Sequence, residues 1–472
     1  MKKTALLLVI VLTLSLFMTS CQPVFDTIGR VVDEVGILLR KPDSAAAVWK
    51  NVDTRMGLLS SYEANLTLDL DLEYSGLKIT GDAIAREIKI NEYYYHSERQ
   101  SLKIDGSNEK VSERLVAYTD GTLYTLHSEN NVYSKFCSPI SFEDFEEFYL
   151  NDANSSVSIP EMTEAFTQTF TKNDDSTWTL VFDDFPKSSI ADMSKDFGFN
   201  NSIFGEITDI TVKVIADSKY RAKEMELSIY NDSGDEPMAS INIAYSNYND
   251  AEKVDFNTDG YVEIEDARFP EMIQKSMQGK VDQPFGKFTL VVAHTAYIPG
   301  AGTQSLLTES DKVTFYNNYN GTDRFYFDVD STYNGSTIKM TFENGVLKTI
   351  AGASSAEEEM DDVDARDIIN QIINSVGYAP YMVKSIEKQT DDTYKLTCKV
   401  SDVQTYKDIA KQLGIGSYQN YSLEIIVRMS GDEVDMFQSN LVIHCTRANY
   451  IVKNTYDFTL EEPTEEPEGG KA

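Results

Sequence analysis

The chain has 472 residues, enough for two or three domains, and carries 76 acidic against 42 basic side chains. The resulting net charge of −34 excludes a general binder of nucleic-acid backbones, because such proteins rely on clusters of cations. The same charge argues against adsorption to anionic lipid through the protein surface, so membrane contact would need a separate anchor.

The N-terminal residues have the order of a bacterial lipoprotein signal. Lys2 and Lys3 give a positive start, and Ala5–Met18 is an apolar run too short for a membrane-spanning helix. Ser20-Cys21 follows, and a small residue before a cysteine resembles the lipobox, at which lipoproteins are acylated and cleaved. We therefore expect a signal peptide up to Ser20 and a lipid anchor on Cys21, which place the protein in the cell envelope on the exported side of a bacterial membrane. The alternative is an ordinary secretory signal with a chance cysteine.

Further along, the pattern predicts helices followed by antiparallel strands. Asp43 or Ser44 caps a predicted helix, and Leu66–Tyr74 then alternates apolar and polar residues, as in a strand with one buried face. Asp120-Gly121 separates two strand-like runs and is a strong hairpin signal, and Asn344-Gly345 predicts a second hairpin. A run of alternating strands needs a cover for its apolar face.

Apolar residues at helical spacing predict four helices that could supply this cover. They are Phe142–Leu150, Ile159–Phe170, Glu271–Met277 and Ala365–Ser375. Between strands and helices, the acidic segment Ala353–Asp364 is predicted to be a loop.

Two stretches of the chain resemble each other. Thr177–Phe199 and Thr393–Ile415 both predict a short strand, a turn, a small helix and a glycine that ends it, at a constant offset of 216 (393 − 177). Upstream, Tyr118–Leu123 matches Phe342–Leu347 at an offset of 224 (342 − 118). A change in offset between matched segments is what loop indels produce, so we predict an old tandem duplication.

The opening Leu58-Leu59-Ser60-Ser61-Tyr62, followed by an alternating strand, resembles the start of LolA-like and LppX-like lipoprotein domains. The resemblance implies an α+β fold of two tandem lobes, each a bent antiparallel β-sheet, or half-barrel, covered by helices. We expect a lipidated tether at 21–43, lobe one at 44–266, lobe two at 267–460 and a disordered acidic tail at 461–472. The family has no catalytic residues to carry over, and its members bind acyl chains or lipids between sheet and helices or carry lipoproteins.

The preferred hypothesis is a membrane-anchored, non-enzymatic lipoprotein that binds an apolar ligand, a lipid or an acyl chain, between sheet and helices. One alternative is a structural or adhesive surface protein with solid-core lobes. Another is a glycan-binding lipoprotein that uses Tyr93-Tyr94-Tyr95, although strand aromatics more often serve packing. No phosphate loop, nucleophile elbow or histidine pair for zinc supports an enzyme; the histidines are His96, His127, His294 and His444.

Asp255–Asp266 fits the ligand spacing of a calcium loop of the dockerin type, with a glycine at the sharp turn. The predicted calcium ligands are Asp255, Asn257, Asp259, Tyr261 and Asp266. The competing interpretation, which we favour, is an acidic linker between the lobes. Ser240–Val254 predicts a strand where a calcium-binding helix–loop–helix would need its entering helix.

Three cysteines remain besides Cys21, so they cannot all pair. Cys398 and Cys445 both fall in strand-like runs, and a disulfide between them stays open. We favour buried free thiols for these two residues and leave Cys137 unassigned.

Overall fold

The computed structural model describes residues 44–74, 77–106, 108–151, 167–183, 185, 207–231, 236–317, 324–374, 377–390, 392–400, 403–412 and 414–459. The predicted signal peptide, tether and acidic tail lie outside them, as does the small helix predicted in the first copy of the repeat. Within the described residues, no helix is long and apolar enough to cross a membrane.

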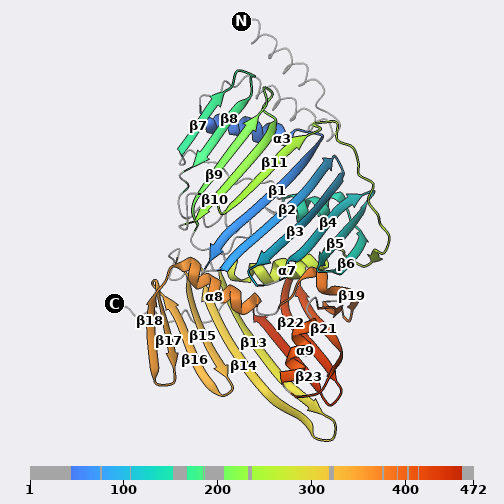
Figure 1. Cartoon of the computed structure of the whole chain (residues 1–472), viewed down its shortest axis with the longest axis vertical. Coiled ribbons are helices and arrows are strands. Elements are labelled where there is room, and N and C mark those ends of the chain that lie inside the picture. The colour runs from blue at the N-terminus through green and yellow to red at the C-terminus, as the bar shows by residue number, and fades with distance from the viewer. Residues whose placement is uncertain are drawn as a thin grey trace, which may run out of the picture.

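The fold is mostly β and consists of two large sheets (Figure 1). The first sheet contains β1 (Ser61–Tyr74), β2 (Leu77–Ile90), β3 (Tyr93–Ile104), β4 (Lys110–Thr119), β5 (Thr122–Glu129), β6 (Val132–Pro139), β7 (Thr167–Lys172), β8 (Trp178–Asp183), β9 (Ile207–Ala216), β10 (Ala222–Asn231), β11 (Ala239–Ser246) and β12 (Val262–Glu263). The second contains β13 (Phe285–Ile298), β14 (Gly302–Tyr316), β15 (Tyr326–Tyr333), β16 (Ser336–Glu343), β17 (Val346–Ala351), β18 (Ser354–Glu359), β19 (Val383–Lys388), β20 (Thr393–Cys398), β21 (Tyr418–Ser430), β22 (Glu433–Cys445) and β23 (Asn449–Thr459).

The helices among the described residues are few and short. They are α3 (Ala45–Gly57), α4 (Phe142–Phe145), α7 (Phe269–Gln278), α8 (Asp362–Asn374) and α9 (Val403–Gln412), with a π-helical turn over Glu146–Asn151 and 3₁₀ turns over Gly279–Asp282 and Pro380–Met382.

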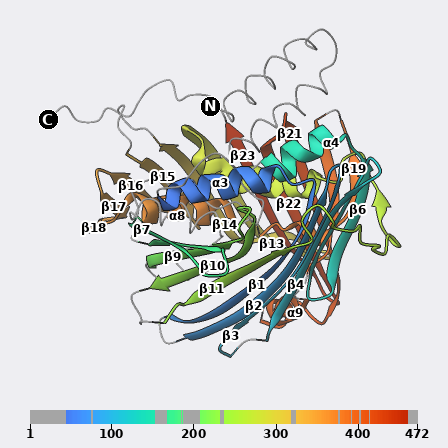
Figure 2. The same ribbon diagram turned by 90° about the horizontal axis from the view of Figure 1, so that it is seen from above.

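The predicted α+β fold, with helices covering each sheet, is therefore wrong. The helices do not form a layer. Helix α3 reaches mainly β7 and β8, and α7 and α8 lie together at the junction of the two lobes (Figure 1). The strands instead bury much of their apolar surface against other strands of the same bent sheet and at the junction of the two lobes. The bend of the first sheet is plain from above (Figure 2).

Both sheets have the same strand order. The first runs β6-β5-β4-β3-β2-β1-β11-β10-β9-β8-β7 and the second runs β18-β17-β16-β15-β14-β13-β23-β22-β21-β20-β19. These neighbours are antiparallel, and only the added two-residue strand β12 runs parallel, beside β6. An early and a late strand pair at equivalent places in the two sheets, where β1 pairs with β11 in the first sheet and β13 pairs with β23 in the second. A shared order this specific supports the duplication predicted from the sequence.

The predicted hairpins are confirmed. Asp120-Gly121 and Asn344-Gly345 both have positive φ at the two turn residues (52° and 76°; 55° and 80°), as the tight hairpin turn requires. Two local predictions are wrong. Ser354–Glu359 in the supposed acidic loop is strand β18, and Thr167–Phe170 at the end of a supposed helix belongs to β7.

Two apolar cores hold the molecule together. The lobe-one core packs Val48 and Val52 of α3 against strands β8 to β11, where Phe182, Val212 and Ile229 are fully buried. The shared core joins both lobes, because it contains Val116 and Phe136 of the first sheet together with the buried aromatic residues of the second. Those aromatic residues are Phe288, Phe315, Phe327, Phe342, Phe437, Tyr450, Tyr456 and Phe458, and Phe325 directly before β15 joins them. Helix α7 lies in this shared core through Phe269, Ile273 and Met277.

Candidate functional sites

The predicted lipidation site, Cys21, lies outside the described residues. The predicted calcium residues do fall within them, in the segment that leaves β11 and crosses to lobe two. This segment runs over the outer face of the first sheet, the face turned away from α3.

Aromatic contacts fix the crossing segment to the sheet. The hydroxyl of Tyr93 donates to the carbonyl of Val254 (3.2 Å) and accepts from its N–H (2.9 Å). Phe256 contacts Tyr95 and Tyr124, with ring centroids 6.0 and 5.4 Å apart. Tyr93 and Tyr94 are buried, and Tyr95 is half-buried against Phe256, so these side chains pack within the protein. Glycan binding stays a prediction.

The second half of the segment is held in the same way. Tyr261 packs on the edge of Tyr124 at 5.4 Å, and the ammonium of Lys135 lies 5.4 Å from the Tyr261 ring centroid. Val262 and Glu263 then pair with β6, and the N–H of Ile264 donates to the carbonyl of Cys137 (3.0 Å).

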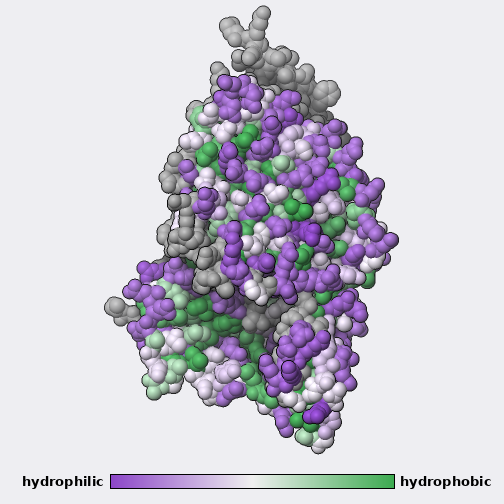
Figure 3. All heavy atoms as spheres, in the orientation of Figure 1, coloured by the Kyte–Doolittle hydropathy of each residue, from purple (hydrophilic) through white to green (hydrophobic). Residues whose placement is uncertain are grey.

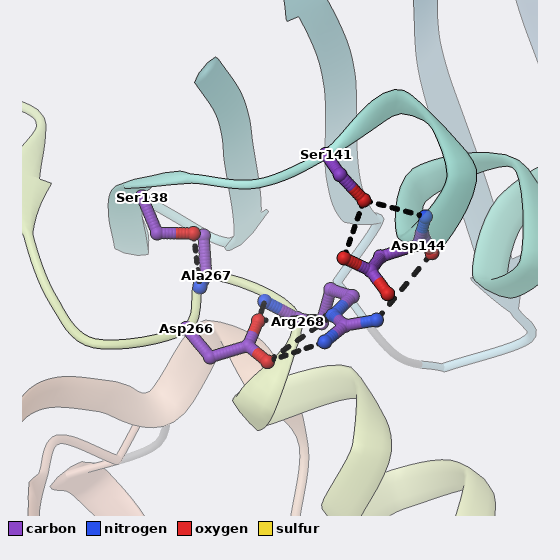
Figure 4. Close-up of polar contacts among 6 residues, drawn as sticks. All are labelled: Ser138, Ser141, Asp144, Asp266, Ala267 and Arg268. Atoms are coloured by element: carbon purple, nitrogen blue, oxygen red, sulfur yellow. Dashed lines mark hydrogen bonds and ion pairs between the residues drawn. The ribbon is translucent and has the colours of Figure 1, made fainter. Parts of the chain in front are cut away.

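Two side chains of the predicted calcium loop, Asn257 and Asp266, have hydrogen-bond partners inside the protein. The N–H of Asp259 donates to Oδ1 of Asn257 (2.8 Å). Asp266 accepts from the Arg268 guanidinium at both carboxylate oxygens, at 2.8 to 3.1 Å (Figure 4). Across the described ranges there is no group of three or more His, Cys, Asp or Glu side chains able to hold a metal ion. Calcium binding by this loop stays a prediction.

A buried ion cluster joins the lobes immediately after this segment. Glu271, in the first turn of α7, is 5% exposed and accepts from Arg114 of β4 (3.1 Å) and from His127 of β5 (2.8 Å). Burial by itself raises the pKa of Glu271, but the attraction of Arg114 and His127 outweighs it and holds that pKa well below its ordinary value. We call Glu271, Arg114 and His127 the junction ion cluster.

Further hydrogen bonds stabilise the same junction. The Thr125 hydroxyl donates to the carbonyl of Ala267 (3.2 Å), and the Ser138 hydroxyl accepts from its N–H (2.9 Å; Figure 4). Tyr378 of lobe two donates to the carbonyl of Pro270 (3.0 Å). The start of α7 is thus fixed from both lobes.

A second buried polar group lies on the inner face of the first sheet. Glu87 of β2 accepts from the hydroxyls of Tyr62 (2.8 Å) and Tyr94 (2.9 Å). Burial, together with the charge of Glu87, raises the pKa of Tyr94 well above its ordinary value. His96 lies beside them and is 4% exposed, and its Nδ1 is 3.9 Å from Glu87. A carboxylate that accepts from two tyrosines is a satisfied structural group.

The outer face of the first sheet carries a hollow of about 460 Å³ across β1 to β5. Its lining includes the apolar side chains Ile84, Leu115 and Leu126 and the cations Arg86 and Arg99. Leu66, Ala85 and Arg114 also border it, but their side chains belong to the inner face, where Arg114 bonds to Glu271. Ile84 is 55% exposed. Figure 3 shows this face, on which hydrophobic residues appear as patches among hydrophilic ones. We call this feature the outer hollow.

A second depression, of about 470 Å³, lies where the crossing segment, α7 and the edge of the second sheet meet. We call it the junction groove. It is lined by Glu263, Ile264, Glu265, Asp266, Phe269, Met272, Ile386, Lys388, Tyr394, Met429, Gly431 and Asp432. Of these residues, only Asp266 had been singled out from the sequence. No sequence signal brings the others together, since they come from four separate segments.

The cysteines within the described part of the chain form no disulfide. Cys137, Cys398 and Cys445 are free thiols, and the last two are buried. Burial raises the pKa of Cys398 to about 12, so its thiol is unreactive near neutral pH.

Comparison with known proteins gives no family for this chain. No protein-family model matches it, and a search of curated proteins found no match.

Three solved structures to which the chain is similar share little sequence with it. The chain is similar to a β-barrel-like protein of a domain of unknown function, DUF1849, from Brucella abortus (13% identity, 40% of this chain and 96% of that chain, TM-score 0.15). It is also similar to MucB in complex with MucA(peri) (6% identity, 88% and 94%, TM-score 0.20) and to a DUF3598 protein of unknown function from Nostoc punctiforme (7% identity, 89% and 100%, TM-score 0.15). TM-scores this low support no argument about fold or function.

Proposed function

We propose that this protein is an exported, membrane-anchored lipoprotein without catalytic activity, and that it binds an apolar ligand with an acyl chain. The anchor follows from the N-terminal pattern of Lys2, Lys3, the apolar run and Ser20-Cys21. The outer hollow carries the binding part of the proposal.

The outer hollow suits an acyl chain that ends in an anionic head group. Its volume of about 460 Å³ lies within the range of small-molecule sites, and Ile84, Leu115 and Leu126 offer apolar contact. Each methylene of an acyl chain removed from water contributes about 0.8 kcal/mol. Arg99 pairs with Glu113 only loosely, at 4.0 Å, so its guanidinium can receive a carboxylate or phosphate.

This location differs from the space between sheet and helices that the sequence suggested. That space required a layer of helices, and the fold does not have one. Binding on the outer face needs no such layer.

Lobe two favours a second candidate, a structural or adhesive role. Its interior is filled with fully buried aromatic side chains, such as Phe315, Phe327 and Tyr456, which is how a solid core is built. In this alternative the lobes act as spacers and bind no lipid.

Native mass spectrometry and fatty-acid uptake separate the two candidates. Protein lacking residues 1–43 should carry added masses that solvent extraction removes, and it should take up a fluorescent fatty acid. Ile84→Glu should reduce the uptake at least tenfold, because it places a carboxylate in the apolar lining of the outer hollow. Because the Ile84 side chain is largely exposed, the replacement should leave the core intact. The matched control is Ile350→Glu at an exposed site of lobe two, which should bind like the wild type. A protein mass without any added ligand, together with no uptake of the fluorescent fatty acid, would favour the structural role.

The anchor is tested separately by cell fractionation. Cys21→Ala should move the protein from the membrane to the soluble fraction. Wild-type protein that is already soluble after secretion would show the lipoprotein assignment to be wrong.

A further inference from the structure

The junction groove lies between the free edges of the two sheets. β12 pairs only with β6, and β19 pairs only with β20, so each is the last strand of its sheet among the described residues. Glu263 of β12 lines one side of the groove, and Ile386 and Lys388 of β19 line the other. An unpaired strand edge presents backbone N–H and C=O groups, which an extended peptide can pair with.

The floor of the groove is apolar and adaptable. Phe269 and Tyr394 touch with ring centroids 4.3 Å apart, and Met272 and Met429 lie beside them. Thioether side chains next to aromatic rings adjust to different apolar partners. A bare metal ion or a purely polar ligand would leave this floor unused, so the occupant needs an apolar side chain.

The rim of the groove is acidic. Four of its residues are carboxylates, namely Glu263, Glu265, Asp266 and Asp432, and Lys388 is its only cation. Two of the carboxylates are already neutralised inside the protein. Glu265 pairs with Lys388 at 3.1 Å, and Asp266 pairs with Arg268 at 2.8 Å.

Glu263 and Asp432 remain available. Both are exposed, and no ion pair involving either occurs in the described part of the chain. Glu263 belongs to the crossing segment, and Asp432 belongs to the turn between β21 and β22. Cations on either side of an apolar anchor would complement them. A second copy of this chain does not fit the site well, because each copy carries a charge of −34.

We propose that the junction groove binds an extended peptide segment of a partner protein, with an apolar side chain flanked by lysine or arginine. The apolar side chain lies on Phe269, Met272, Tyr394 and Met429, and the cations face Glu263 and Asp432. This site is separate from the outer hollow and does not depend on lipid binding there.

The test uses the full chain in a nonionic detergent and a fluorescein-labelled octapeptide with a central Leu-Phe pair and lysines on both sides. Fluorescence anisotropy should show saturable binding to the wild type. A peptide with glutamate in place of each lysine should not bind. Combining Glu263→Lys with Asp432→Lys should weaken binding at least tenfold.

The matched control reverses two exposed carboxylates of β18, by Glu358→Lys with Glu359→Lys. Both double variants change the net charge by +4, from −34 to −30, so they separate site-specific binding from general attraction. The control should bind like the wild type. Equal weakening in the two double variants, or no binding to the wild type, would overturn the proposal.

Two further measurements keep the interpretation unambiguous. A benzophenone analogue of the peptide should crosslink to peptides containing residues 263–272 or 386–394, and crosslinks elsewhere would refute the location. Spermidine should not compete at equal concentration. If spermidine binds with the same dependence on Glu263 and Asp432, the groove is a polyamine site and the peptide proposal is wrong.

Discussion

Removing Glu271 should destabilise the whole molecule, because this carboxylate is the centre of the junction ion cluster. Loss of one partner of a buried ion pair costs about 3–5 kcal/mol, since the other charge is left without compensation. The Arg114 side chain is 33% exposed and water can solvate part of it, so we expect the lower end for Glu271→Ala, about 3 kcal/mol. With an unfolding entropy of about 2.1 cal/mol/K per residue, the lobes at 44–460 give about 0.9 kcal/mol/K, so Tm should fall by about 3 °C.

Calorimetry of purified variants measures this loss. Glu357→Ala is the control, since it breaks an exposed pair with Lys348 and should cost at most about 1 kcal/mol. Replacing both Glu271 and Arg114 by methionine should restore much of the stability, because no buried charge is then left alone. Equal melting temperatures for Glu271→Ala and Glu357→Ala would refute the assigned role of the cluster.

The pH dependence gives an independent check. The pKa of Glu271 is lowered in the folded protein, so its contribution is complete above the ordinary glutamate pKa of about 4.3 and declines as the pH falls below that value. The stability difference between the wild type and Glu271→Gln should therefore be constant near pH 7 and shrink in acid. A difference that grows as the pH falls would have the wrong sign.

Three other perturbations have defined outcomes. Gly286→Ala should lower stability by about 1–3 kcal/mol in thermal melts, because its new methyl group would overlap the Phe315 ring on the neighbouring strand. Gly57→Ala, with open space around it, should not destabilise. Millimolar calcium should raise Tm if the Asp255–Asp266 loop binds it, and the double variant Asp255→Ala with Asp259→Ala should abolish this rise. Identical melting curves with calcium and with a chelator would leave only the linker interpretation. Cys398 and Cys445 should resist iodoacetamide at pH 8 until the protein is unfolded, as followed by mass spectrometry, and rapid labelling of native Cys398 would contradict its burial.

The features that the sequence predicted correctly are those fixed by local chemistry. Asp120-Gly121 and Asn344-Gly345 mark hairpins because few other residues adopt positive φ readily, whatever surrounds them. The helix around Glu271–Met277 and the helix around Ala365–Ser375 were predicted for a similar reason, since each presents apolar residues to one side over several turns.

The features that were missed depend on distant partners. β18 has the sequence Ser-Ser-Ala-Glu-Glu-Glu, with no apolar alternation, and is a strand because it pairs with β17. Glu271 and Arg114 are 157 positions apart in the sequence, and no local pattern around either residue predicts that they pair. The fold class was wrong for the same reason, because helices such as α7 and α8 were predictable but the surfaces they would cover were not.

The shared core has a mechanical consequence. The chain crosses from one lobe to the other through a single segment, yet the lobes are also joined by α7, by the junction ion cluster and by apolar side chains from both sheets. A force that pulls on lobe two is therefore shared between the side-chain contacts at the junction and the connecting segment. The backbone of that segment carries only part of the force. Two lobes packed together in this way transmit a load from one end of the molecule to the other as one rigid body. Two lobes joined only by a flexible linker would first move apart.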